Sequence, residues 1–79
     1  MHNPGYIGLY FSRGVTYFLA QQFDKAIKDF DRYIRKEPKD PSAYLNRGAS
    51  WLFLGDTLKA VNDYNKAIRL DRFDPENER

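Results

Sequence analysis

The 79-residue sequence has no cysteine, a single histidine and no long hydrophobic run, and these absences exclude several kinds of site. Without cysteine the chain forms no disulfide, thiolate metal site or cysteine nucleophile. His2 has no second metal ligand or nucleophile near it in the sequence, so we expect neither a metal site nor a catalytic triad. The longest nearly apolar stretch, residues 51–54, is far too short to cross a bilayer.

The sequence also lacks any cluster of charges of one sign. Thirteen basic and eleven acidic residues give a formal charge of +2 and are interspersed, so no basic block predicts a nucleic-acid partner. The first residues lack the pattern of a signal peptide, and we expect a cytoplasmic protein with no membrane partner. No glycine-rich phosphate loop occurs, and the carboxylates lie beside lysine or arginine. We therefore expect no cofactor, no small-molecule substrate and no enzymatic activity.

Aromatic residues are abundant, with six tyrosines, six phenylalanines and one tryptophan making up 16% of the chain. A chain of this length buries only about 60 to 65% of the surface that its unfolded form exposes. One small domain, residues 1–79, is the most that the length allows. Its core must be built from large rings, which require small residues opposite them.

The sequence contains an internal repeat with a period of 34 residues. Aligning residues 1–45 with 35–79 gives eleven identities: Pro4/Pro38, Tyr10/Tyr44, Arg13/Arg47, Gly14/Gly48, Lys25/Lys59, Ala26/Ala60, Asp29/Asp63, Ile34/Ile68, Arg35/Arg69, Asp40/Asp74 and Pro41/Pro75. A period of this length is typical of arrays of helix pairs, which usually bind other proteins.

The hydrophobic pattern within each unit indicates two helices. Tyr10, Gly14 and Tyr17 follow the spacing i, i+4, i+7, and a similar spacing returns after a polar break. Asp40-Pro41 is a typical helix start, because the carboxylate caps free amides and proline fits the first turn. The prediction is an all-α protein with four main helices near 5–20, 23–36, 41–54 and 57–71.

Gly14 and Gly48 occupy equivalent mid-helix positions, where glycine costs about 1 kcal/mol relative to alanine. We expect close approach of the partner helix to compensate. Ala26 and Ala60 would supply the small surface on the other side, with Tyr17 and Trp51 closing over the crossing.

The spacing resembles the tetratricopeptide repeat, whose 34-residue unit runs W-x₂-L-G-x₂-Y, then A-x₃-F, then P. The matching residues are Tyr10, Gly14, Tyr17, Ala26, Phe30 and Pro38 in the first unit, and Tyr44, Gly48, Trp51, Ala60, Tyr64 and Ala67 in the second. Arg13 and Arg47 depart from the usual leucine, and Tyr33 replaces a customary small residue. The resemblance implies tandem helix-turn-helix units forming a right-handed α-solenoid. Repeat one would span about 7–40, repeat two about 41–74, and residues 75–79 would begin a third unit or cap.

A second apolar stripe runs along the first helix of each unit. The resemblance implies that this stripe faces a concave groove, where a partner peptide or helix would bind by apolar burial. The predicted groove residues are Phe11, Val15, Phe18, Leu45, Asn46, Ala49 and Leu52. Alternatively, neighbouring helices or a second copy of the chain cover the stripe. Some family members bind acidic chaperone tails, but only Asn46 matches their polar set.

The charged residues have two possible roles. Arg13 and Arg47 would either bind a ligand carboxylate or pair within the protein, and the second role is favoured. The i, i+4 pairs Lys25/Asp29, Asp31/Arg35 and Lys59/Asp63 are interpreted as a solvated outer face of the second helices.

The last helix carries Val61, Tyr64, Ala67, Ile68 and Leu70 with no following helix to cover them. Repeat arrays need about three units before each apolar face has a neighbour. Two functions therefore remain open. The chain is a protein-interaction module with an apolar groove, or it is a structural repeat that forms a homo-oligomer through uncapped ends, as a fragment of a longer array or an engineered repeat.

Overall fold

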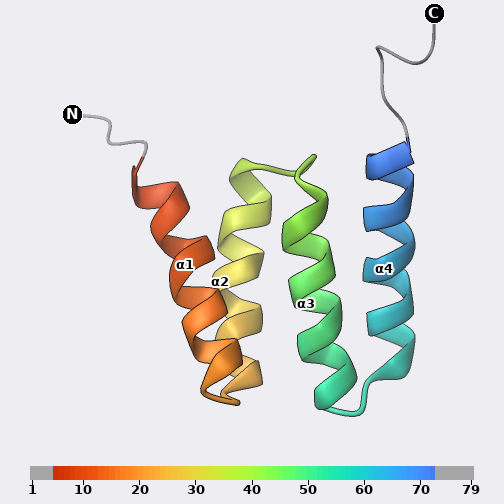
Figure 1. Cartoon of the computed structure of the whole chain (residues 1–79), viewed down its shortest axis with the longest axis horizontal. Coiled ribbons are helices and arrows are strands. Elements are labelled where there is room, and N and C mark those ends of the chain that lie inside the picture. The colour runs from red at the N-terminus through yellow and green to blue at the C-terminus, as the bar shows by residue number, and fades with distance from the viewer. Residues whose placement is uncertain (1–4, 73–79) are drawn as a thin grey trace, which may run out of the picture.

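Four α-helices in two antiparallel hairpins make up the part of the chain that the computed structural model describes, residues 5–72 (Figure 1). They are α1 (Gly5–Leu19), α2 (Phe23–Lys36), α3 (Pro41–Phe53) and α4 (Thr57–Arg72). The predicted all-α class and four helices are confirmed, with every boundary within one residue. His2 and the predicted third unit at 75–79 lie outside the described residues. Within 5–72 no helix is long and apolar enough to cross a membrane.

The helices lie side by side in chain order in a slab of 42 × 39 × 16 Å (Figure 1). Each packs extensively on the next, whereas α1 and α3 touch only slightly. The central helices α2 and α3 therefore supply most of the buried residues: Ala26, Ile27, Asp29, Phe30, Ala43, Tyr44, Gly48 and Ser50. The outer helices α1 and α4 each have one side on which no described helix packs.

Both hairpin turns use the same backbone hydrogen bonds. Gln21 N donates to Phe18 O at 2.9 Å and Gln22 N to Tyr17 O at 2.8 Å. The second turn repeats this pattern 34 residues later, at Gly55 and Asp56. The motif requires a left-handed residue after the helix, with φ of 63° at Gln21 and 92° at Gly55. Gly55 adopts that conformation without strain, and Gln21 does not.

The loop between the units is fixed by Asp40. Its Oδ1 accepts a hydrogen bond from Ser42 N at 2.9 Å, and Pro41 follows in the first turn, as predicted. Its Oδ2 accepts from the Tyr33 hydroxyl, which raises the pKa of Tyr33 to about 12, with burial as a second cause. Tyr44 Oη donates to Pro38 O at 2.8 Å, so α3 is tied to the loop as well.

Gly14 and Gly48 do lie where a neighbouring helix comes close, and the nearest side-chain atoms belong to residues other than the predicted alanines. The atoms nearest to a Cβ built on Gly14 belong to the ring of Phe30, with Cε1 at 2.7 Å. At Gly48 they belong to Tyr64, with Cε1 at 3.0 Å, and to Asp63. Ala26 and Ala60 are fully buried but one turn away from these contacts. An aromatic ring fills the space because the bare backbone leaves room for it.

Candidate functional site

Each unit contains an arginine on its first helix that forms a bidentate ion pair with an aspartate on its second helix. Arg13 Nε and Nη2 donate to the carboxylate of Asp29 at 2.8 and 2.9 Å. Arg47 makes the same two-pronged contact with Asp63, at 2.9 and 2.8 Å. The charged hydrogen bonds raise the pKa of both arginines further above its usual value. Both guanidinium groups are thus engaged within the protein, so the intramolecular role predicted for them is the one observed.

The prediction of a solvated outer face for the carboxylates is wrong. Asp29 is 1% exposed and Asp63 6% exposed, because both turn toward the arginine of the preceding helix. The predicted partners Lys25 and Lys59 lie instead over aromatic rings, and Lys59 Nζ is 4.4 Å from the Trp51 ring centroid.

The predicted pairing of Asp31 with Arg35 differs from the observed one. Asp31 joins the two units, because its Oδ1 accepts from Arg47 Nη1 at 2.7 Å. Arg47 therefore bridges α2 and α4 from α3. A bridge of this kind fixes the register of the units, because bidentate and bridging contacts both constrain the guanidinium plane.

The predicted groove residues of α1 are all half-buried. Phe11 packs edge-on against Tyr33 and Phe30, with ring centroids 5.0 and 5.8 Å away. Tyr33, which departs from the small residue of the repeat pattern, thus supplies a wall for Phe11. Phe18 lies edge-on to Phe23 of α2 at 5.4 Å and to Phe53 of α3 at 5.8 Å. Val15 lies between Phe11 and Phe18 on the helix.

The groove residues predicted on α3 are more open. Leu45 is 48% exposed and Leu52 is 47% exposed, while Ala49 is half-buried. Asn46 is half-buried, and its Nδ2 donates to Ser42 O of its own helix at 3.0 Å. The α3 part of the stripe is thus an apolar ridge with one polar residue beside it.

The most exposed members of this surface are not among the residues predicted from the sequence. Leu19 is 74% exposed and Phe53, its counterpart 34 residues later, is 66% exposed. Phe53 stacks on Phe23 at 5.0 Å with an interplanar angle of 7°. The signal was present, because each stripe continues to i+8. We call the surface formed by these residues the α1–α3 face: Phe11, Val15, Phe18, Leu19, Leu45, Ala49, Leu52 and Phe53.

The α1–α3 face contains a hollow at its aromatic end. This hollow has a volume of about 340 Å³ and is lined by Phe18, Leu19, Gln21, Phe23 and Phe53. Three rings and a leucine favour apolar and aromatic ligand groups. No set of three metal-ligating side chains occurs within residues 5–72.

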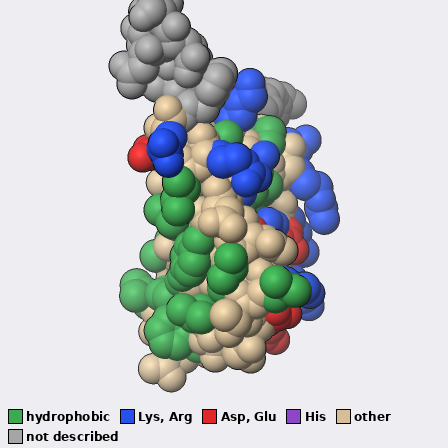
Figure 2. Space-filling view, turned by 90° about the vertical axis from the view of Figure 1, so that its right-hand side faces the viewer, with side chains coloured by type: hydrophobic (Ala, Val, Ile, Leu, Met, Phe, Trp, Pro, Cys, Tyr) green, Lys and Arg blue, Asp and Glu red, His purple; other side chains and the backbone are tan. Residues whose placement is uncertain are grey.

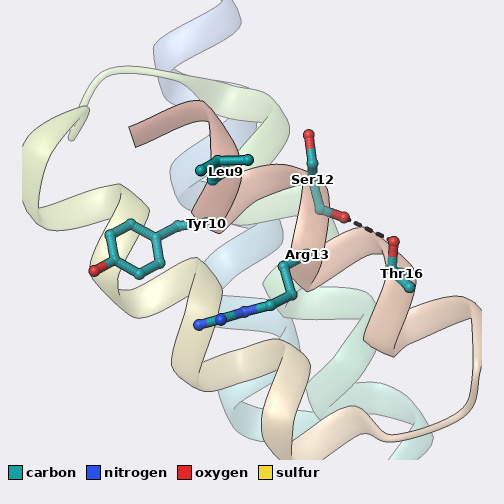
Figure 3. Close-up of a pocket in the computed structure, with 5 residues that line it drawn as sticks. All are labelled: Leu9, Tyr10, Ser12, Arg13 and Thr16. Atoms are coloured by element: carbon teal, nitrogen blue, oxygen red, sulfur yellow. Dashed lines mark hydrogen bonds between the residues drawn. The ribbon is translucent and has the colours of Figure 1, made fainter. Parts of the chain in front are cut away.

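The outer side of α1 carries a second and larger hollow, of about 540 Å³ (Figure 3). It is lined by Leu9, Tyr10, Ser12, Arg13 and Thr16, which project from the same stretch of α1. Leu9 is 60% exposed. The guanidinium of Arg13 runs from this surface toward α2, where Asp29 holds it.

The outer side of α4 is partly apolar. In the view toward α4, hydrophobic side chains gather over one side and the lower part, while lysines and arginines lie mainly above them and along the opposite edge (Figure 2). Val61 is 44% exposed and Ile68 is 49% exposed, as expected for an uncovered helix. Ala67, which was expected to be uncovered with them, is only 2% exposed. It borders a hollow of about 240 Å³ with Leu45 and Ile68.

Residues 8–40 match one family profile of the tetratricopeptide repeat, and residues 41–74 match a second. Their boundary coincides with the start of α3, at the Asp40-Pro41 helix start. No curated protein matches the chain closely enough to count as a relative.

Proposed function

Because the chain belongs to the tetratricopeptide repeat family, whose repeats generally act in protein–protein interaction, we propose that it binds a partner protein through the α1–α3 face. The ligand is an amphipathic helix or a short extended segment with apolar anchors. The recognising residues are those predicted from the sequence, Phe11, Val15, Phe18, Leu45, Asn46, Ala49 and Leu52, together with Leu19 and Phe53.

One observation carries this proposal, namely the exposed aromatic cluster at the α1–α3 boundary. Phe53 keeps 66% of its surface exposed although it stacks on Phe23. Exposed apolar groups that gather in one place, as these rings do beside Leu19, commonly mark interaction sites. Large aromatic anchors also contribute more binding energy than most other interface residues.

The polar groups beside this face determine little about the ligand. Asn46 lies next to its α3 part, and the Asn46 side-chain nitrogen already donates to Ser42 O. Arg13 and Arg47 are held by Asp29 and Asp63. We therefore propose a ligand bound mainly by apolar burial, rather than an acidic tail bound by cations. No catalytic role is assigned to the chain.

The proposal is tested with a random peptide library displayed on phage and the 79-residue chain as bait. The most enriched sequence is synthesised and titrated by calorimetry against the wild type, Phe53→Ser and Leu58→Ser. Leu58 is 72% exposed, so it is a matched control on a different helix. We expect Phe53→Ser to raise the dissociation constant about tenfold or more, as for the loss of an aromatic anchor. Leu58→Ser should leave the dissociation constant unchanged.

Circular dichroism of both variants checks that their helices are intact. The proposal fails if no peptide is enriched over an unrelated helical bait. It also fails if the selected peptide binds Phe53→Ser as tightly as the wild type.

A further inference from the structure

The internal repeat allows each exposed surface to be compared with its counterpart in the other unit. Ile27 of α2 is 6% exposed, whereas Val61, its counterpart on α4, is 44% exposed. Ile34 is half-buried, whereas its counterpart Ile68 is 49% exposed. The difference arises because α3 packs on α2, while no described helix packs on the outer side of α4.

The first helices of the two units show the complementary surface of this contact, which is buried on α3 and exposed on α1. Ala43 and Ser50 of α3 are fully buried. Their counterparts on α1 are Leu9, which is 60% exposed, and Thr16, which is also exposed. The side chain of Arg47 is 21% exposed and that of its counterpart Arg13 is 55% exposed.

The uncovered sides of α1 and α4 are therefore the two halves of one interface, which the chain already forms internally between α2 and α3. We propose that α1 of one copy packs on α4 of a second copy in the geometry of the internal α2–α3 contact. The occupant of each end is thus another molecule of this chain. The contact is heterologous, so each added copy leaves one α1 and one α4 open, and assembly continues into chains.

The polar part of the internal contact predicts the register of the external one. Inside the chain, Arg47 uses Nε and Nη2 for Asp63 and Nη1 for Asp31 of the preceding unit. Arg13 uses the equivalent Nε and Nη2 for Asp29. The counterpart of Asp31 is Asn65, which is exposed. Arg13 Nη1 of one copy would therefore donate to Asn65 Oδ1 of the preceding copy, whose α4 packs on this α1.

This register predicts that the contact between copies is weaker than the internal contact. A carboxylate accepts from a guanidinium more strongly than a neutral amide does. The external contact therefore lacks the ion pair that Asp31 supplies internally. Asn65→Asp would restore it between copies.

The proposal is tested by sedimentation velocity on the 79-residue chain over a concentration series from micromolar to near millimolar. We expect reversible growth beyond the dimer as concentration rises. Leu9→Glu on α1 and Ile68→Glu on α4 should each give a monomer, because a buried unpaired charge opposes either half of the contact. Both positions are exposed in the free chain, so neither change should unfold it.

Mixing the two variants is the decisive measurement. Leu9→Glu retains an intact α4 side and Ile68→Glu an intact α1 side, so an equimolar mixture should form a 1:1 dimer and nothing larger. Asn65→Asp should raise the association constant between copies about tenfold over the wild type, the ratio expected when a charged acceptor replaces a neutral one. Leu58→Ser is the control, because its counterpart Asp24 is exposed in the first unit and lies outside the repeated contact.

Three outcomes would overturn the proposal. A monomer at every concentration excludes self-assembly and leaves the ends to a different partner. A dimer that does not grow and survives Leu9→Glu shows a symmetric contact instead. If Asn65→Asp does not raise the association constant, the proposed register, in which Arg13 meets Asn65 of another copy, is excluded.

Discussion

Replacing Gly14 with alanine tests the close approach of α2 to α1 at this position. Gly14 lies in the middle of α1 with the ring of Phe30 directly against its backbone. A Cβ at this position would lie 2.7 Å from Phe30 Cε1 and 3.0 Å from Cδ1 and Cζ. Phe30 is fully buried, so its ring has little freedom to move away.

Two opposing effects set the magnitude. Alanine stabilises a helix interior by about 1 kcal/mol relative to glycine. Adding a methyl group to a packed core costs about 1–3 kcal/mol. Gly8, also in α1, has nothing within 4 Å of its Cβ position and shows the first effect alone. Gly14→Ala and Gly8→Ala should therefore differ in unfolding free energy by about 1–3 kcal/mol.

Urea unfolding followed by far-ultraviolet circular dichroism measures this difference. Gly48→Ala should fall between the two variants, because Tyr64 is only half-buried and can shift from its 3.0 Å contact. Gly14→Ala should lower the unfolding free energy less in a Phe30→Leu background than in the wild type, since the two residues touch. If Gly14→Ala stabilised the chain as much as Gly8→Ala, the reasoning about the crossing would be refuted.

Three further changes test other contacts, each by the same unfolding measurement. Asp63→Asn should lower the unfolding free energy by about 2 kcal/mol, because the buried charged hydrogen bonds to Arg47 are weakened. Asp56→Asn is the control, because it alters an exposed pair and keeps a side chain that can cap α4. It should change the unfolding free energy by less than about 0.5 kcal/mol. Equal effects would contradict the burial of Asp63. Gln21→Gly should stabilise the chain by about 1 kcal/mol, since φ is 63° there, and a loss of stability would argue against the left-handed turn. The hydrogen bond to Asp40 raises the pKa of Tyr33 from 10.0 to about 12, so the advantage of the wild type over Tyr33→Phe should be complete below pH 10 and disappear as the pH rises through about 12. An advantage independent of pH across that range would show that Tyr33 does not hold its proton in this way.

The features predicted best from the sequence depend on short-range physics. Helix boundaries follow from the spacing of apolar residues, and the start of α3 follows from Asp40-Pro41, because caps and first turns are local. The repeat itself is visible from identities such as Gly14/Gly48. Family membership follows from the same residues.

The charged pairs were predicted poorly for a definite reason. Asp29 is four residues from Lys25, and this spacing fits an exposed pair as well as any other arrangement. Its burial depends on the rotation of α2 against α1, which brings Arg13 to its carboxylate at 2.8 Å. A guanidinium sixteen residues away has no local signal that identifies it as the partner.

By itself the sequence determined the four helices, the cap at the start of α3 and the duplication of the unit, because these depend on the pattern of residues along the chain. Only the tertiary structure decided which ring lies on Gly14, that Phe23 stacks on Phe53, and which sides of α1 and α4 are uncovered. Those features depend on how one helix is rotated and shifted against another. That arrangement is set by the packing of many side chains at once, and no short stretch of sequence specifies it.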